Sequence, residues 1–166
     1  MSGRRTGSKC SSSQRTLSYP RAMIAILGTG LLGSGFTRAL RKQGHDVRVW
    51  NRTPEKARAL ADTGAMPVGD AAEAVRGAER IHVVVSDDSA VDSVLEAAKL
   101  ESGALVIDHS TTSTAGARER TARWRAHGVT YLHAPVFMGP QNAAESTGLM
   151  LVSGDRAVVE SVSPML

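Results

Sequence analysis

The chain has 166 residues, which is enough for one domain with a sizeable hydrophobic core. Its single cysteine, Cys10, excludes an internal disulfide, and no apolar run approaches the length of a membrane-spanning helix. The net charge of +4 comes from the first 22 residues, which hold five basic residues and no acidic one, so that the remainder carries −1. The charge of the folded part therefore gives no reason to expect a nucleic acid or a membrane as partner.

Residues 1–22 are rich in Ser, Arg and Gly and almost free of apolar residues, so we expect a disordered basic tail. Three origins stay open. The tail is an added leader or a misassigned start, since Met23 is a natural initiator; or a transit peptide, which is also Arg- and Ser-rich; or an arm for anionic partners. The lack of an amphipathic stripe favours the first origin. We expect the folded domain to span residues 23–166.

The first element pattern of that domain is strand, glycine turn, helix, strand. An apolar run at 23–27 leads into GTGLLG at 28–33, a helical pattern continues to about residue 43, and a second apolar run follows at 47–50. This order is the opening βαβ unit of a dinucleotide-binding fold. Gly28 permits the tight turn, Gly30 lets a pyrophosphate approach the backbone, and Gly33 lets the helix pack on the strand. The N-terminus of the helix then faces the phosphates.

The end of the second strand predicts which dinucleotide binds. A site for NAD usually has Asp or Glu there, but this chain has Asn51 followed by Arg52. An arginine can pair with a 2′-phosphate through two N–H donors, whereas a carboxylate would repel it. Thr53 adds a hydroxyl and Lys56 lies within one turn, so we predict NADP(H) over NAD(H). Thr53 is equally suited to cap a helix that starts at Pro54, and both roles can hold together.

Alternating strands and helices continue to the end of the chain. We expect further strands at 66–68, 81–85, 104–108, 130–133 and 148–153, and helices at 54–62, 70–76, from the turn at 86–89 to about 98, from about 114 to 127, and at 155–162. Pro67 places the 66–68 strand at an edge, and His82 is expected to be a core or sheet-end residue. The pattern predicts an α/β fold of the Rossmann type, with a doubly wound, mostly parallel sheet in three αβα layers.

In such a sheet, ligands bind beyond the carboxyl ends of the strands. That rule selects the clusters at 28–33, 51–53, 85–86 and 108–111, with 134–139 nearby. Two of their side chains, Ser110 and Thr111, carry hydroxyls that suit the orientation of a carboxylate and an amide. The alternative for this pair is a helix N-cap.

Several motifs together resemble the NAD(P)-binding domain of the β-hydroxyacid dehydrogenases, a family with 3-hydroxyisobutyrate and 6-phosphogluconate dehydrogenases and, more distantly, imine reductases. These motifs are GTGLLG at 28–33, GHDVRVWNRTPEKA at 44–57, DHSTTS at 108–113, APV at 134–136 and GLMLVSGD at 148–155. The resemblance covers residues 23–166. It implies cofactor contacts from Gly28, Gly30, Leu31, Leu32, Gly33, Asn51, Arg52, Thr53, Val85, Ser86 and Thr111. It implies substrate contacts from Ser110 and Gly139, and no metal.

The chain departs from the family pattern at 133–139. The family often has Asp-Ala-Pro-Val-Ser-Gly-Gly, whereas this chain has HAPVFMG, so half of a two-glycine backbone site for a substrate carboxylate is lost. Phe137 and Met138 are bulky and apolar. They indicate a less polar substrate than a small hydroxy acid, and a packing role for both is equally open.

The resemblance also implies a catalytic lysine on a long helix after this domain. The lysines of this chain are Lys9, Lys42, Lys56 and Lys99, so we expect the catalytic one beyond Leu166, together with an all-helical second domain. The chain is then the NADP-binding part of a cytoplasmic oxidoreductase that acts on a small-molecule substrate, and its full-length form is expected to be a homodimer or higher oligomer. The alternatives are a non-catalytic NADP-binding module and an enzyme like the imine reductases.

Overall fold

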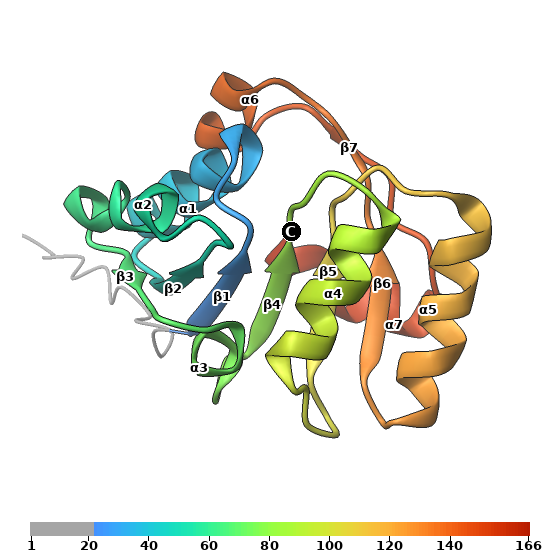
Figure 1. The fold of residues 1–166 in the computed structure, drawn as a ribbon. Helices are drawn as coiled ribbons and strands as arrows, with labels where there is room; N and C mark the ends of the chain where they lie inside the picture. The colour runs from blue at the N-terminus through green and yellow to red at the C-terminus, as the bar shows by residue number, and fades with distance from the viewer. Residues whose placement is uncertain (1–21) are drawn as a thin grey trace, which may run out of the picture.

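The computed structural model describes residues 22–166, so the expectations for residues 1–21 lie outside the described part. Figure 1 shows strands flanked by helices. The strands are β1 (Met23–Leu27), β2 (Asp46–Trp50), β3 (Met66–Pro67), β4 (Arg80–Val83), β5 (Leu105–Asp108), β6 (Thr130–His133), β7 (Val136–Phe137) and β8 (Leu149–Met150). The helices are α1 (Leu31–Lys42), α2 (Pro54–Arg58), α3 (Ala71–Val75), α4 (Asp88–Ala98), α5 (Thr114–Ala126), α6 (Pro140–Glu145) and α7 (Arg156–Val162), with short 3-10 turns η1 (Ala61–Thr63) and η2 (Ser163–Met165).

Six parallel strands form one sheet in the order β3-β2-β1-β4-β5-β6, which confirms the expected Rossmann-type fold. The strand order reverses between β1 and β4. The connections that follow these two strands therefore run to opposite faces of the sheet. They leave a crevice at the carboxyl ends of the strands, which is where such sheets bind ligands. The short strand β3 is at the edge of the sheet, as Pro67 predicts.

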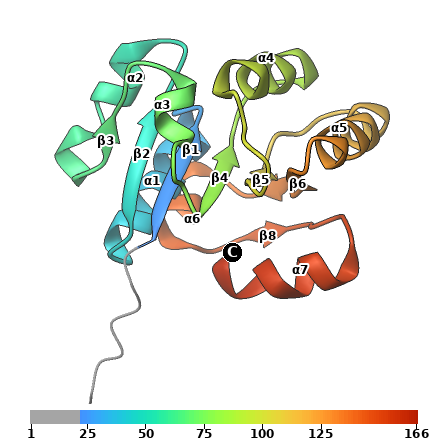
Figure 2. The same ribbon diagram turned by 90° about the horizontal axis from the view of Figure 1, so that it is seen from below.

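Helices cover both faces of the sheet. On one face, side chains of α3, α4 and α5 share a core with Ala25, Leu27 and Val83, and on the other face Phe36 and Leu40 of α1 share a core with β2 residues. In the view of Figure 2, α4 and α5 lie on one side of the strands, and α7 lies on the other. The central strands are buried on both faces, which is why they read as continuous apolar runs. None of the helices described for residues 22–166 is long and apolar enough to cross a membrane.

The prediction of a helix at 54–62 is wrong for its second half. The α-helix ends at Arg58, and the chain continues through the 3-10 turn η1. From Leu60 onward the backbone bonds span three residues, as the N–H of Leu60 donates to Ala57 and that of Thr63 to Leu60, and the hydroxyl of Thr63 also donates to the carbonyl oxygen of Leu60 at 2.6 Å. Gly64, in a left-handed conformation at φ +81°, then ends the turn.

The strand expected at 148–153 is also corrected. Only Leu149–Met150 forms a strand, and it pairs antiparallel with β7 in a separate two-stranded sheet, while Ser153 makes an isolated antiparallel bridge to His133. Between the two short strands lies α6, a helix that the sequence pattern did not indicate. It packs against α1 so closely that a Cβ at Gly35 would lie 2.7 Å from the Cβ of Ala143.

Candidate dinucleotide site

The glycine turn after β1 is built by close backbone packing. Gly28 has φ +102°, and a Cβ at this residue would overlap the carbonyl oxygen of Val84. A Cβ at Gly33 would overlap the carbonyl oxygen of Gly28. A Cβ at Gly30, in contrast, would have no atom within 4 Å. Two of the glycines therefore close the turn, and the third leaves open space at the start of α1.

The N-terminus of α1 faces that open space. Gly30 occupies the N-cap position and has no side chain to bind the first backbone N–H groups, and the first turn carries no acidic residue. The helix is 12 residues long, so its dipole and its free N–H groups make a favourable place for an anion. The backbone thus fits the diphosphate of a dinucleotide.

Asn51, at the end of β2, joins this strand to the glycine turn. Its Oδ1 accepts the N–H of Thr29 at 3.0 Å, and its Nδ2 donates to the carbonyl oxygen of Thr53 at 3.1 Å. The role of Asn51 is therefore to hold the two segments together. Thr53 is at the N-cap of α2, as the alternative interpretation expects, but its hydroxyl makes no capping bond.

A groove of about 550 Å³ connects these segments. Its lining includes every residue predicted to contact the cofactor except Thr111. The full lining is Gly28, Gly30, Leu31, Leu32, Gly33, Trp50, Asn51, Arg52, Thr53, Lys56, Val84, Val85, Ser86, Ala90, Ser93 and Val94. No carboxylate is among these residues. Arg52 and Lys56 make no ion pair with residues 22–166, so both cations are available to an anion in the groove.

Ser110 lies behind the groove. It is buried, its Oγ accepts the N–H of Val85 at 3.0 Å, and its own N–H donates to Oδ1 of Asp108 at 2.9 Å. Thr111 is exposed beside it. The N-cap of α5 is Ser113, whose Oγ accepts the N–H of Gly116 at 3.1 Å, so neither Ser110 nor Thr111 caps the helix.

The segment at 137–139 lies apart from the groove. Gly139 is at the N-cap of α6, and its N–H donates to Oδ1 of Asn142 at 3.1 Å, so a side chain of the same segment uses the donor that the resemblance assigns to substrate. Met138 lines a second cavity, in agreement with a packing role, whereas Phe137 is 64% exposed.

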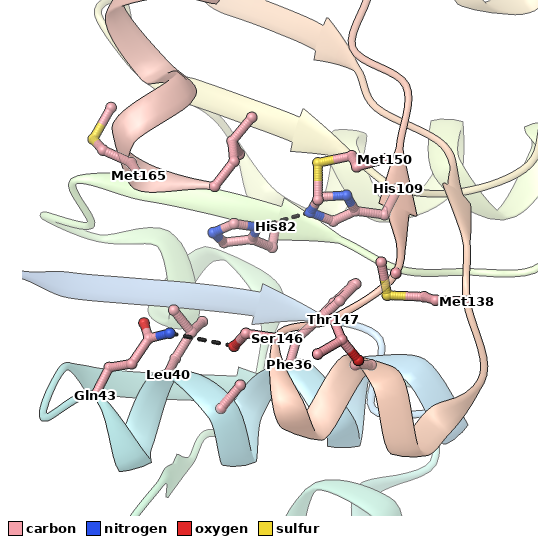
Figure 3. Close-up of a pocket in the computed structure, with 14 residues that line it drawn as sticks. Phe36, Leu40, Gln43, His82, His109, Met138, Ser146, Thr147, Met150 and Met165 are labelled. Atoms are coloured by element: carbon pink, nitrogen blue, oxygen red, sulfur yellow. Dashed lines mark hydrogen bonds between the residues drawn. The ribbon is translucent and has the colours of Figure 1, made fainter.

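The second cavity, of about 180 Å³, lies between α1, α6 and the sheet, as Figure 3 shows. Two buried imidazoles meet there: Nδ1 of His82 lies 2.8 Å from Nε2 of His109. Nε of Arg80 donates to Nε2 of His82 at 3.2 Å, which leaves His82 to donate from Nδ1 to His109. Nδ1 of His109 then donates to the carbonyl oxygen of Ala134 at 3.0 Å. Every ring nitrogen has a partner, so His82 is a core residue, as expected.

This chain of hydrogen bonds requires both imidazoles to be neutral. Burial, followed by the charges of neighbouring His109 and Arg80, holds the pKa of His82 well below its usual value. Burial also lowers the pKa of His109, to about 4. Nothing in the sequence pattern paired the two histidines, because they are 27 residues apart and lie on or directly after neighbouring strands.

The fold and the groove together define a Rossmann-type dinucleotide-binding domain. Residues 23–166 match the family described as the NAD binding domain of 6-phosphogluconate dehydrogenase, and the chain belongs to this family. It is 34% identical over 150 residues to 3-sulfolactaldehyde reductase of Escherichia coli (strain K12), covering 87% of this chain and 50% of that protein.

Solved structures agree with this assignment. A Mycobacterium tuberculosis 3-hydroxyisobutyrate dehydrogenase with L-serine is 32% identical, with a TM-score of 0.82 over 89% of this chain and 51% of that one. The V8 variant of an imine reductase from Myxococcus stipitatus, in complex with NAD⁺, is 26% identical, with a TM-score of 0.83 over 89% of this chain and 52% of that one. The chain therefore spans about half the length of these relatives.

Proposed function

We propose that the chain binds NADP(H) and forms the cofactor-binding half of an oxidoreductase that acts on a carbonyl or carbinol carbon of a small 3-hydroxyacid-like substrate. The preference for NADP(H) over NAD(H) is inferred from the residues at the end of β2 and just after it. Two cations, Arg52 and Lys56, line the groove there without ion-pair partners among the described residues, and the lining holds no carboxylate. A ribose 2′-phosphate needs such cations, whereas the 2′-hydroxyl of NAD favours a carboxylate.

Different residues of this chain would bind different parts of the cofactor. The free N–H groups at the start of α1 bind the diphosphate, and the guanidinium of Arg52 and the hydroxyl of Thr53 bind the 2′-phosphate. Val85 and Ser86 border the nicotinamide half, with the hydroxyl of Ser110 behind them. When bound, the nicotinamide supplies or accepts the hydride, and the protein positions it. We assign transfer of the alcohol proton to a group in the half of the relatives that this chain does not match.

Equilibrium titration of the 166-residue chain with NADPH and with NADH tests the proposal. Trp50 lines the groove, whereas Trp124 is buried in α5 outside it, so fluorescence quenching reports on the site. We expect NADPH to bind at least tenfold more tightly, which corresponds to about 1.4 kcal/mol from the 2′-phosphate contacts. Tighter binding of NADH would contradict the assignment of Arg52.

A second candidate substrate is an imine. The exposed Phe137, the apolar Met138 and the bond between Asn142 and the N–H of Gly139 leave little at 137–139 to bind a carboxylate. Fold similarity alone does not choose between the candidates, because the TM-scores to an imine reductase and to 3-hydroxyisobutyrate dehydrogenase are 0.83 and 0.82. Assays of the full-length protein with a cyclic imine and with 3-hydroxyisobutyrate distinguish the two, and turnover of only the hydroxy acid would remove the imine candidate.

A further inference from the structure

A buried arginine joins three elements next to the proposed nicotinamide end of the groove. Arg120 of α5 is 1% exposed. Its Nη2 donates to Oδ1 of Asp88 at 2.6 Å and its Nη1 to Oδ2 of Asp92 at 3.3 Å, both on α4. Its Nε donates to Oη of Tyr131 on β6 at 3.1 Å. All three nitrogens of the guanidinium are thus bound to different side chains.

One branch of this network leads to Ser110. Oη of Tyr131 donates to Oδ2 of the buried Asp108 at 2.5 Å. Oδ1 of the same carboxylate accepts the N–H of Ser110, whose Oγ accepts the N–H of Val85. The chain of contacts therefore runs from the guanidinium to a backbone group that lines the groove.

A second branch fixes the neighbouring loop. Oδ2 of Asp88, at the start of α4, accepts the N–H of Ser113, the N-cap of α5, at 2.9 Å. Space for the pair of Asp88 and Arg120 is kept by Gly116, where a Cβ would overlap Oδ1 of Asp88 and lie 3.1 Å from Nη2 of Arg120. Arg120 thus holds both the loop that enters α4 and the loop that enters α5.

Stability alone does not explain an arginine at this position. Taking a guanidinium out of water is costly, and replacing a whole buried ion-pair network by apolar side chains of similar volume is often neutral or stabilising, although removing one partner alone is not. What an apolar side chain cannot do is set the relative positions of two loops, because that needs directional hydrogen bonds.

We propose that Arg120 is a positioning residue for the nicotinamide half of the cofactor site. The inference rests on the proposed function. A dinucleotide that spans the crevice between β1 and β4, with its 2′-phosphate at Arg52, has its nicotinamide half over the ends of β4 and β5. The two loops that Arg120 holds follow these strands, so loss of its hydrogen bonds weakens contacts to that half and leaves the adenosine half unchanged.

The test compares two ligands on Arg120→Met. NADPH carries both halves, whereas adenosine 2′,5′-bisphosphate carries only the half that Arg52 binds. We expect the variant to lose about tenfold in NADPH affinity, the lower end of the loss found when a partner that orients a metal ligand is removed, and to bind the bisphosphate as the parent chain does. Arg123→Met is the matched control, because Arg123 lies on the same helix and pairs with Asp92 but not with Asp88. It should bind both ligands normally.

Two results would overturn the proposal: unchanged NADPH affinity in Arg120→Met, or an equal loss for both ligands.

Another variant, Gly116→Ala, displaces the Asp88 carboxylate without removing Arg120. Alanine favours a helix over glycine by about 1 kcal/mol, so a loss of NADPH affinity in this variant cannot come from a weaker helix. Arg120→Lys is the second variant should the methionine chain not fold, and it should restore part of the affinity through Asp88.

Amide hydrogen exchange separates this proposal from the proposed function. If the parent chain binds neither ligand, the proposed function fails, and exchange at the N–H groups of Val85 and Ser113 still reports on the loops. Faster exchange at both in Arg120→Met, with unchanged exchange in β1, supports a positioning role. Exchange equal to that of the parent chain contradicts it.

Discussion

At the scale of single residues, the preference between NADP(H) and NAD(H) depends on position 52. Arg52 is exposed at the rim of the groove, and its neighbour Asn51 is already engaged with Thr29 and Thr53. A carboxylate at position 52 would repel a 2′-phosphate and accept hydrogen bonds from a ribose 2′-hydroxyl. We expect Arg52→Asp to lower NADPH affinity at least tenfold and to raise NADH affinity, which two titrations followed by Trp50 fluorescence would measure.

The matched control for this substitution is Arg58→Asp. Arg58 lies at the end of α2, six residues after Arg52, pairs with Glu55 at 3.3 Å and does not line the groove, and its substitution changes the net charge by the same amount. Long-range electrostatics would lower NADPH affinity equally in both variants, and that result would contradict a direct contact between Arg52 and the 2′-phosphate.

At the scale of elements, His82 of β4 is hydrogen-bonded to His109, the residue directly after β5. Because both histidines are buried, the stability of the fold depends on pH. Both pKa values are lower in the folded chain than in the unfolded one, so the unfolded chain binds more protons as the pH falls. The free energy of unfolding is therefore highest above pH 6.5 and falls on acidification toward about pH 4. For His109 alone, the loss amounts to about 3 kcal/mol in urea unfolding.

A substitution separates this effect from the titration of carboxylates. His109→Gln keeps one donor and one acceptor but does not titrate, so it should reduce the slope of unfolding free energy between pH 6.5 and 4.5. The exposed His127, which contacts the carbonyl oxygen of Arg123, is the control position. An unchanged slope in His109→Gln would show that groups other than this histidine cause the pH dependence.

At the scale of the whole molecule, the groove links cofactor binding to folding. Its walls come from the loops after β1, β2 and β4 together with the end of β2, α1, α2 and α4, so an unfolded chain has no site. A ligand at one hundred times its dissociation constant then stabilises the fold by about 2.7 kcal/mol. Thermal unfolding should shift upward by roughly 10 °C with NADPH, and by less with NADH at equal concentration. Equal shifts would argue against selection by the 2′-phosphate.

Local patterns were sufficient for the first βαβ unit and for most of the later elements. The glycine turn can be recognised from six residues, and burial of the parallel strands makes them apolar on both faces. The errors lie in short elements, where a few neighbouring residues decide the pattern of backbone hydrogen bonds. After Arg58 the backbone changes to 3-10 hydrogen bonding, which the apolar spacing at 54–62 does not reveal, and Gly139 with Pro140 starts a helix of six residues that is too short for a periodic signal.

The sequence by itself determined the fold, the glycine turn and the charged end of β2, because each of these depends on residues that are close together in the chain. Only the tertiary structure decided the polar contacts behind the groove. Arg120 and Asp88 are 32 residues apart, and His82 and His109 are 27 apart. Hydrogen bonds of this kind need two side chains within about 3 Å in defined directions, and no periodicity in the sequence carries that information.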